Sequence, residues 1–256
     1  MLSINENEHM LEQKYRPQTL EECILPSKDK ALFEGLIKKG KIPHIILHSA
    51  SPGTGKTTLA RILVESLDME YIFVNGADVK LDYIRSVLTP FASTNSLEGK
   101  AKAIIIDEFD RRDLIESQKY LRSFMEAYSS NCSIIITAND INAFIEPLKD
   151  RCRVIKFGDP SPEDEVRMMK EMIVRMVQIC KNENVKVTEP KALVALVKKT
   201  FPSFRKTILT LDQYLSKSDT IDLGILNEVL ENRSNLNEII EAMKAKDVKA
   251  LRALSA

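Results

Sequence analysis

The segment from Ser49 to Thr58, Ser-Ala-Ser-Pro-Gly-Thr-Gly-Lys-Thr-Thr, places a lysine and two threonines directly after a glycine-rich turn. A phosphate-binding loop usually reads Gly, four residues of any type, then Gly-Lys-Ser/Thr. This chain matches at Gly55, Lys56 and Thr57 but carries Ala50 at the leading glycine position. Glycine is required there only where φ is positive or a Cβ finds no room, so we expect alanine to be tolerated. The alternative interpretation is a tight turn of small residues.

The chemistry of such a loop is phosphate binding. Backbone N–H groups between a strand and a helix face an anion, and the helix dipole assists them. The lysine reaches the β- and γ-phosphates, and the next hydroxyl contacts Mg²⁺. We therefore predict that Thr57 binds Mg²⁺ and that the whole loop binds ATP through Pro52, Gly53, Thr54, Gly55, Lys56, Thr57 and Thr58.

A second motif ends in two adjacent carboxylates. The apolar run from Ala103 to Ile106 is followed by Asp107 and Glu108. Because neighbouring strand residues point in opposite directions, Asp107 is predicted to approach the metal while Glu108 polarises the attacking water. Two solvated acids at a strand end are the alternative for this motif alone. After a phosphate loop in the same chain, the motif indicates a nucleoside triphosphatase.

Five short apolar runs must form the elements that position these motifs, and they are residues 45–47, 71–74, 103–106, 133–136 and 154–157. The middle runs are continuous rather than alternating, which is typical of strands covered on both faces of a parallel sheet. Amphipathic segments at 57–67 and 116–128 lie between them. We predict a three-layer α/β domain with a parallel five-stranded sheet over residues 1–158.

The pattern becomes helical after Asp159. Ser161 is a candidate helix cap, Pro162 suits the first helical position, and Asp164 stands where a capping-box acid belongs. Helically spaced apolar residues follow at Val166, Met169, Ile173, Met176, Val177 and Cys180. With further helical patterns at 190–199, 204–215 and 223–230, they predict a small all-helical domain over residues 159–232. Within the last segment, residues 233–256, the stretch from Leu236 to Leu254 is expected to form two short helices.

Composition narrows the choice of partners. Lysine plus arginine and aspartate plus glutamate both count 37, so nucleic-acid binding would need a local basic patch. The four cysteines form no Cys-x-x-Cys pair and the three histidines show no ligand spacing near them, so we expect no zinc site but reduced thiols in a cytoplasmic protein. The polar N-terminus and the lack of an apolar run near ~18 residues argue against secretion and membrane insertion.

The order of motifs resembles that of AAA+ ATPases and, more narrowly, of sliding-clamp loaders. Residues 11–17, Leu-Glu-Gln-Lys-Tyr-Arg-Pro, resemble the Glu-Lys-Tyr-Arg-Pro box near the start of clamp-loader ATPase subunits. The phosphate loop, Asp-Glu-Phe-Asp at 107–110, Thr-Ala-Asn at 137–139 and Asp-Arg-Cys at 150–152 follow in the family's order. The likeness is strongest to the large, ATP-hydrolysing subunits of T-even bacteriophage loaders and covers nearly the whole chain.

This resemblance implies further catalytic residues. Asn139 matches the first sensor, which aligns the water and the γ-phosphate; taken alone it is a strand-end turn residue. Arg151 matches an arginine finger that enters the neighbouring subunit's ATP site and stabilises charge on the transferring phosphoryl group. A surface arginine without a role is the alternative. Asp150 stands where the family has serine, in a position to form an ion pair with Arg151. Arg205 matches the second sensor, on the lid, which contacts the nucleotide.

The same resemblance implies binding surfaces. The nucleoside end of ATP is expected to contact Tyr15, Arg16, Ile24 and Leu25, with packing as the alternative for Tyr15. Gln118 matches a glutamine that links DNA contact to the catalytic glutamate. Lys80 and Arg85 are the DNA candidates, with Arg111 and Arg112 as further possibilities, and each is otherwise a solvated charge. The clamp candidates are Leu88, Pro90 and Phe91, which would otherwise belong to the core.

The resemblance implies an ATPase subunit of a clamp loader. ATP binding would join copies of this chain and a different small subunit into a complex that holds an opened sliding clamp and primer–template DNA, and hydrolysis would release both in the host cytoplasm. The alternatives are a helicase loader or other AAA+ remodelling ATPase, and a non-hydrolysing structural loader subunit. Loaders of this family carry a third, helical collar domain, for which only residues 233–256 are available, so we expect a truncated collar.

Overall fold

The computed structural model describes residues 4–5, 8–157 and 159–227. It divides into two compact units, of which the first contains Arg16–Met168 and the second contains Ile4–Tyr15 and residues 169–227. The predicted collar segment, 233–256, lies outside the described residues.

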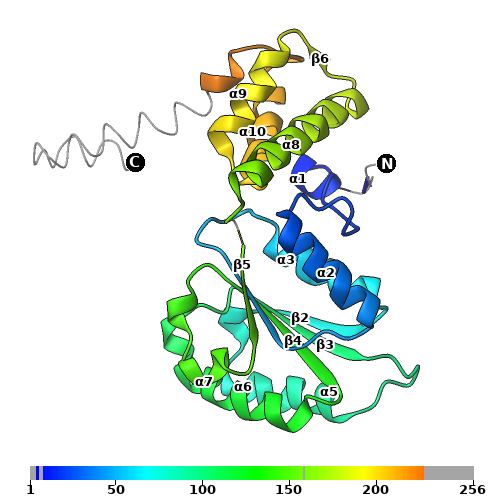
Figure 1. The fold of residues 1–256 in the computed structure, drawn as a ribbon, viewed down its shortest axis with the longest axis vertical. Coiled ribbons are helices and arrows are strands. Elements are labelled where there is room, and N and C mark those ends of the chain that lie inside the picture. Colours follow the sequence, from blue (N-terminus) through cyan, green and yellow to red (C-terminus); the bar gives the residue numbers. More distant parts are fainter. Residues whose placement is uncertain (1–3, 6–7, 158, 228–256) are drawn as a thin grey trace, which may run out of the picture. The chain divides into compact units, whose positions relative to one another are not determined.

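A five-stranded sheet forms the centre of the first unit (Figure 1). Its strands are β1 (Ile45–His48), β2 (Glu70–Asn75), β3 (Lys102–Asp107), β4 (Cys132–Ala138) and β5 (Arg153–Lys156). The order across the sheet is β2-β3-β4-β1-β5, and every neighbouring pair is parallel. The predicted parallel five-stranded sheet is therefore confirmed.

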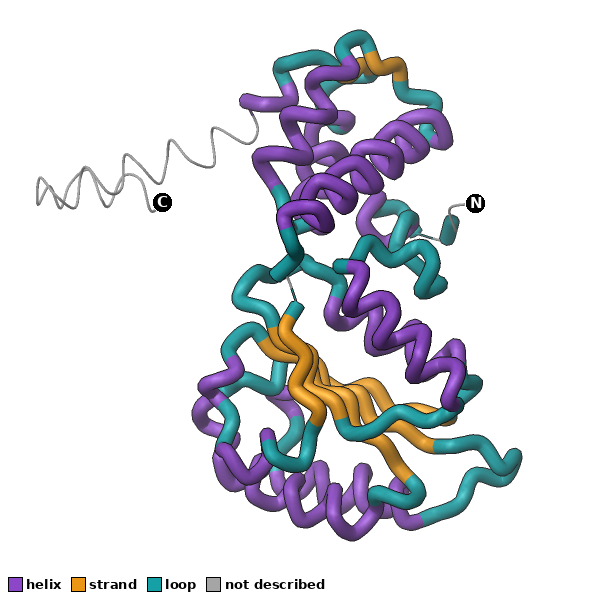
Figure 2. The backbone as a smooth tube through the Cα atoms, in the orientation of Figure 1, coloured by secondary structure: helices purple, strands orange, loops and turns teal. Residues whose placement is uncertain are grey.

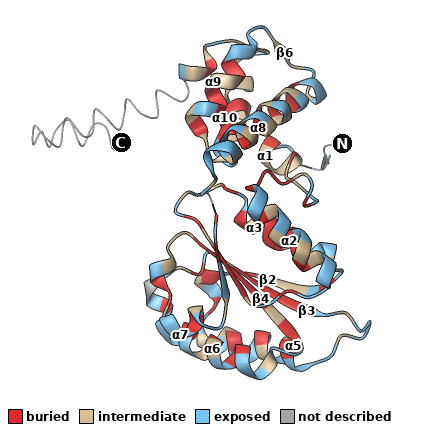
Figure 3. Ribbon diagram, viewed as in Figure 1, coloured by how far each residue is buried: buried red, intermediate tan, exposed pale blue. Residues whose placement is uncertain are grey.

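Helices cover both faces of this sheet, as Figures 1 and 2 show. One face packs against α2 (Ser27–Lys39) and α3 (Lys56–Ser66), and the other against α5 (Thr89–Ser93), α6 (Ile115–Tyr128) and α7 (Glu146–Lys149). Successive β3 residues alternate between the two apolar layers, because Ile105 packs with α2 and α3 while Ile104 and Ile106 pack with α6. All three isoleucines are fully buried. Figure 3 shows that the middle strands of the sheet are largely buried. This explains the continuous apolar runs.

Short elements complete the first unit. The 3₁₀ turn η1 (Gly76–Asp78), α4 (Leu81–Tyr83) and the π-helical turn η2 (Ile84–Leu88) connect β2 to α5. The 3₁₀ turns η3 (Arg112–Leu114) and η4 (Ile141–Ala143) follow β3 and β4.

The second unit contains α1 (Leu11–Lys14), most of α8 (Pro162–Asn182), α9 (Pro190–Thr200) and α10 (Phe204–Leu215). It is not purely helical, because β6 (Lys186–Val187) and β7 (Thr220–Ile221) form a parallel pair. At the start of α8, the Ser161 hydroxyl accepts a hydrogen bond from the Asp164 amide at 3.1 Å, as the capping pattern predicts.

The predicted apolar face of α8 was only partly right. Its fully buried residues are Met168, Met172, Met176, Ile179 and Cys180, whereas Val166 is 49% exposed. Methionines recur along the helix and make several faces apolar, so spacing alone does not select the packed one. The elements that pack against α8 determine which of its faces is buried.

Candidate nucleotide-binding site

The phosphate-loop segment connects the end of β1 to the start of α3. Its left-handed residues are Gly53, with φ of 75°, and Gly55, with φ of 94°. Ala50 is not among the described residues with positive φ, so the backbone at position 50 does not require glycine. The expectation that alanine fits the backbone at this position is confirmed.

The sheet order explains which residues meet at this loop. Strand β1 lies between β4 and β5, and β4 lies beside β3, so the carboxyl ends of β1, β4 and β3 are neighbours. Ligands of open α/β sheets bind at such a switch of strand order. The Ser49 amide extends the pairing by donating to the Ala138 carbonyl at 3.2 Å. This contact brings the phosphate loop beside Asn139.

Lys56 is buried, with 8% of its surface exposed, and its ammonium group contacts oxygen atoms around the loop. The Nζ donates to Asn139 Oδ1 at 3.1 Å and to the carbonyls of Ser49 and Ser51 at 3.4 Å each. Lys56 and Asn139 are 83 residues apart in the chain. The structure thus joins the predicted phosphate lysine to the predicted first sensor.

Two hydroxyl groups hold the Asp107 carboxylate. Thr57 Oγ1 donates to Asp107 Oδ1 at 2.6 Å, and Thr137 Oγ1 donates to the same oxygen at 2.5 Å. A hydroxyl and a carboxylate that converge beside a phosphate loop are the hard oxygen ligands that Mg²⁺ prefers. Thr57 and Asp107 therefore fit the metal predicted for them.

Glu108 lies at the exposed end of β3 in a left-handed conformation, with φ of 57°. Its amide donates to Thr137 Oγ1 at 3.0 Å, so Thr137 contacts both acidic residues. Gly76 packs on the other side, where an added Cβ would stand 2.5 Å from Phe109 Cα. This close packing and the Thr137 contact fix the backbone that carries Glu108. The sequence motif contained Thr137 but indicated no role for it.

Asp110 holds the turn that carries Asn139. Its Oδ2 accepts hydrogen bonds from the backbone amides of Asn139 at 2.7 Å and Asp140 at 2.8 Å. Through these two bonds the Asp110 carboxylate fixes the backbone of Asn139, the predicted first sensor. Sequence reasoning missed this contact, because only the fold brings the ends of β3 and β4 together.

Gln118 of α6 anchors the segment between β4 and α7. Fully buried, it donates through Nε2 to the Ala143 carbonyl at 3.0 Å and accepts from the Ile145 amide at 2.9 Å. Its role as a link to DNA stays a prediction.

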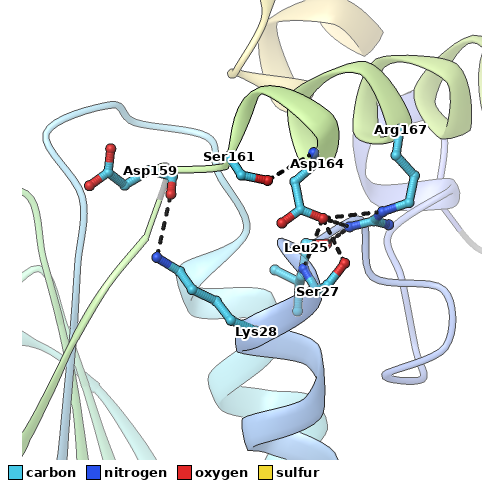
Figure 4. A network of polar contacts seen from close by, with 7 residues as sticks. All are labelled: Leu25, Ser27, Lys28, Asp159, Ser161, Asp164 and Arg167. Carbon is cyan, nitrogen blue, oxygen red and sulfur yellow. Dashed lines mark hydrogen bonds and ion pairs between the residues drawn. The ribbon is translucent and has the colours of Figure 1, made fainter.

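The predicted nucleoside contacts of the first unit lie near the phosphate loop and the start of α2. Arg16 Nε donates to Thr58 Oγ1 at 2.9 Å, and Ile24 and Leu25 are buried. In Figure 4, the Arg167 guanidinium points toward Leu25 and donates to its carbonyl at 2.6 Å. The buried carbonyl before α2 is therefore occupied by an arginine of α8.

Asp164, one turn before Arg167 on α8, contacts Ser27 at the start of α2 (Figure 4). Its Oδ1 accepts from the Ser27 hydroxyl at 2.6 Å, the Ser27 amide at 3.1 Å and Arg167 at 2.8 Å. The Ser27 hydroxyl, then Arg167, hold the pKa of Asp164 well below its usual range. The first turn of α8 is thereby joined to the first turn of α2.

Two further predicted residues belong to the second unit. Tyr15 is 1% exposed and its hydroxyl donates to Glu183, which also pairs with Lys14 at 2.7 Å. Burial and Glu183 raise the pKa of Tyr15, so the hydroxyl remains a donor. Arg205 lies 3.8 Å from Glu12. Nucleotide contact by Tyr15 and Arg205 stays a prediction.

Among the described residues, Arg151 does not form an ion pair with its neighbour Asp150. Arg151 instead pairs with Glu126 of α6, and the shortest contact is 2.7 Å. Glu126 is distant in sequence, so no local pattern indicated it. The helix and the turn meet only through packing on one face of the sheet.

The proposed DNA and clamp residues lie along the segment after β2. Lys80 and Arg85 are exposed, and the Arg85 guanidinium stands 5.3 Å from the centre of the Tyr120 ring. Of the clamp candidates, Leu88 is fully buried in the core and is therefore not a surface residue. Pro90 is exposed and Phe91 is half-buried.

The described residues lack two features. They contain no group of three or more histidine, cysteine, aspartate or glutamate side chains placed to hold a metal ion. Within the same residues, no helix has the length and apolar character needed to cross a bilayer.

A phosphate loop at the switch point of a parallel sheet, beside a strand that ends in Asp107 and Glu108, defines a P-loop nucleoside triphosphatase. Comparison with known families agrees. Residues 46–159 match the ATPase family associated with various cellular activities (AAA), and residues 164–227 match the sliding-clamp-loader large subunit, AAA+ ATPase lid domain.

Individual relatives narrow the family. The chain is 59% identical to the sliding-clamp-loader large subunit of Escherichia phage RB69 and 57% identical to that of Enterobacteria phage T4, matching over its full length and over 79% and 80% of theirs. It is 32% identical to the replication factor C small subunit of Archaeoglobus fulgidus, over 88% of this chain and 69% of that one. This chain belongs to the sliding-clamp-loader large subunits of the AAA+ ATPases.

Solved structures agree on the fold. A mutant of Thermotoga maritima RuvB superposes with a TM-score of 0.66 at 23% identity, covering 90% of this chain and 81% of that one. At this identity the likeness shows the fold alone.

Proposed function

We propose that this chain is the ATP-hydrolysing subunit of a sliding-clamp loader. The observation that carries the proposal is the convergence of Lys56, Thr57 and Asp107 at one end of the sheet, in a chain of this family. Asn139 joins the same group through Lys56. These are the groups that phosphoryl transfer requires: a phosphate cation, metal ligands and a polar group near the γ-phosphate.

The phosphate loop and the residues at the strand ends bind different parts of ATP and its metal ion. The left-handed turn at Gly53 and Gly55 aims backbone N–H groups at phosphate oxygens, and Lys56 contacts the β- and γ-phosphates. Thr57 and Asp107 hold Mg²⁺, which when bound neutralises charge on the phosphates. Arg16, Ile24, Leu25 and Tyr15 are the proposed contacts of the nucleoside. The lid residue Arg205 is the second sensor.

Hydrolysis needs a polarised water and a stabilised transition state. Glu108 orients and polarises the water, and Asn139 aligns it with the γ-phosphate. Arg151 of a neighbouring subunit supplies positive charge to the transferring phosphoryl group. A subunit alone thus lacks one catalytic group, which makes hydrolysis depend on assembly.

The partners follow from family membership. ATP binding assembles copies of this chain with a different small subunit around an opened clamp and primer–template DNA, in the cytoplasm of the host. Lys80 and Arg85 contact DNA phosphates, which gives affinity without sequence choice. Pro90 and Phe91 face the clamp. DNA then triggers hydrolysis, which releases the closed clamp.

An ATPase assay of the assembled loader tests this proposal, with clamp and primed DNA added together, singly or not at all. We expect both together to stimulate turnover, and we expect Glu108→Gln to abolish turnover while retaining ATP binding. Turnover indifferent to clamp and DNA would instead indicate another remodelling ATPase. ATP binding without turnover in the wild type would indicate a structural subunit.

A further inference from the structure

The turn that carries Arg151 is fixed by its own backbone. It follows α7, where the Arg151 amide donates to the Leu148 carbonyl at 3.1 Å and the Cys152 amide donates to the Lys149 carbonyl at 3.0 Å. These bonds set where the arginine side chain begins. They do not set where its guanidinium points.

Glu126, in the last turn of α6, provides that orientation. Glu126 Oε1 accepts a hydrogen bond from Arg151 Nε at 2.8 Å and lies 2.7 Å from Arg151 Nη2 in an ion pair. A guanidinium has five N–H donors in a rigid fork, so this contact occupies one edge and leaves further donors for an anion. The pairing therefore orients the group without using all of its hydrogen-bonding capacity.

A buried contact between Cys152 and Met125 lies beside the ion pair of Arg151 with Glu126. Cys152 Sγ lies 3.9 Å from Met125 Sδ, so the residues next to Arg151 and Glu126 also meet. Met125 is 1% exposed, and burial raises the pKa of Cys152 to about 12, which keeps its thiol neutral. The turn is thus joined to α6 at two successive positions, one apolar and one charged.

Arg122, one helical turn before Glu126, donates to the same Oε1 at 3.4 Å. Arg151 holds the pKa of Glu126 below its ordinary value, with Arg122 as a smaller contribution. The carboxylate therefore stays ionised and keeps its hold on Arg151 at neutral pH.

We propose that Glu126 is the positioning residue for Arg151, holding its guanidinium in the orientation in which it enters the neighbouring subunit's ATP site. This inference rests on the proposed function, because it takes Arg151 as the arginine finger. Fixing the side chain before insertion removes part of the ordering cost at the moment of reaction, which is the benefit of a preorganised catalytic group.

The first test compares Glu126→Ala and Glu126→Gln with Glu116→Ala in the assembled loader with clamp and primed DNA. Glu116 is a matched control, since it is an exposed glutamate of the same helix in an ion pair with Lys119. A misplaced catalytic group costs up to about 100-fold, so we expect Glu126→Ala to lower kcat about 10- to 100-fold with an unchanged KM for ATP. Glu126→Gln keeps an acceptor oxygen and should be intermediate. Wild-type turnover by Glu126→Ala would overturn the inference.

The second test mixes variants, because a residue that acts through Arg151 works in the neighbouring site. A Glu126→Ala subunit retains its own Glu108, while a Glu108→Gln subunit retains an oriented Arg151. We expect a mixture of Glu126→Ala with Glu108→Gln to turn over faster than either variant alone, as a mixture of Arg151→Ala with Glu108→Gln should. Recovery with Arg151→Ala but not with Glu126→Ala would overturn the inference and leave the proposed function intact. Full turnover by Arg151→Ala alone would contradict the arginine finger itself.

Discussion

The Thr137 hydroxyl offers a sharp test of the catalytic geometry, because it contacts both Asp107, the last residue of β3, and Glu108, which follows it. Thr137→Val replaces a hydroxyl by a methyl group at a position that is 1% exposed. The change leaves the Glu108 amide without its 3.0 Å acceptor and removes the 2.5 Å donor from Asp107. The side-chain volume stays nearly the same, so the effect is that of the lost hydrogen bonds.

The magnitude follows from those two contacts. A buried N–H left without a partner costs about 1–3 kcal/mol, and a hydrogen bond to a charged group contributes about 1.5–3 kcal/mol. The bond from the Glu108 amide is only partly buried, so its loss stands near the lower end of the first range. Asp107 retains its contact with Thr57, so we expect a total loss of about 2–4 kcal/mol rather than the full sum. At about 2–4 °C for each kcal/mol, the melting temperature of the first unit should fall by roughly 4–16 °C.

The assay combines thermal unfolding, ATP binding and stimulated ATPase turnover. We expect kcat to fall about tenfold or more, because a small displacement of Glu108 misaligns the water. Thr210→Val is the control, since Thr210 is also buried but donates only to the Lys206 carbonyl of its own helix. Its removal should cost little. If Thr137→Val melts and turns over like Thr210→Val, the hydroxyl does not hold the strand-end acids and the reasoning fails.

Three further predictions concern single side chains. Asp110→Ala should lower kcat about tenfold with retained ATP binding, because the amides of Asn139 and Asp140 lose their acceptor; steady-state kinetics would contradict this if only KM changed. Ala50→Gly should change ATP affinity by less than about twofold, because position 50 has no positive φ; a titration that shows a gain of tenfold would refute it. The pKa of Asp164 is lower in the folded state than the unfolded-state value of ~3.9, so the ionised carboxylate stabilises the fold at pH values above ~3.9. This stabilisation is lost as the pH falls toward the folded-state pKa. Asp164→Asn should therefore be less stable at pH 7 and lose less stability in acid than the wild type, and an acid-unfolding curve parallel to the wild type would contradict this.

Much of the fold was predictable because its signals are local. The Gly-Thr-Gly-Lys-Thr segment indicates a loop between a strand and a helix, and continuous β-branched runs indicate strands covered on both faces. The helix that begins at Pro162 was predicted with its serine cap. Periodicity failed to choose the buried face of α8, where methionines make several faces apolar.

The candidate site was predictable in its parts but not in its connections. The sequence by itself determined the phosphate loop and the adjacent acids Asp107 and Glu108 at the end of β3, because each motif depends on neighbouring residues. Only the tertiary structure decided that Asn139 meets Lys56, that Thr137 and Asp110 support the acids and the sensor, and that Glu126 rather than Asp150 holds Arg151. These contacts join residues distant in sequence. They form because the strand order places particular strand ends together and packs α6 against one particular turn, and a pattern of neighbouring residues does not encode that choice.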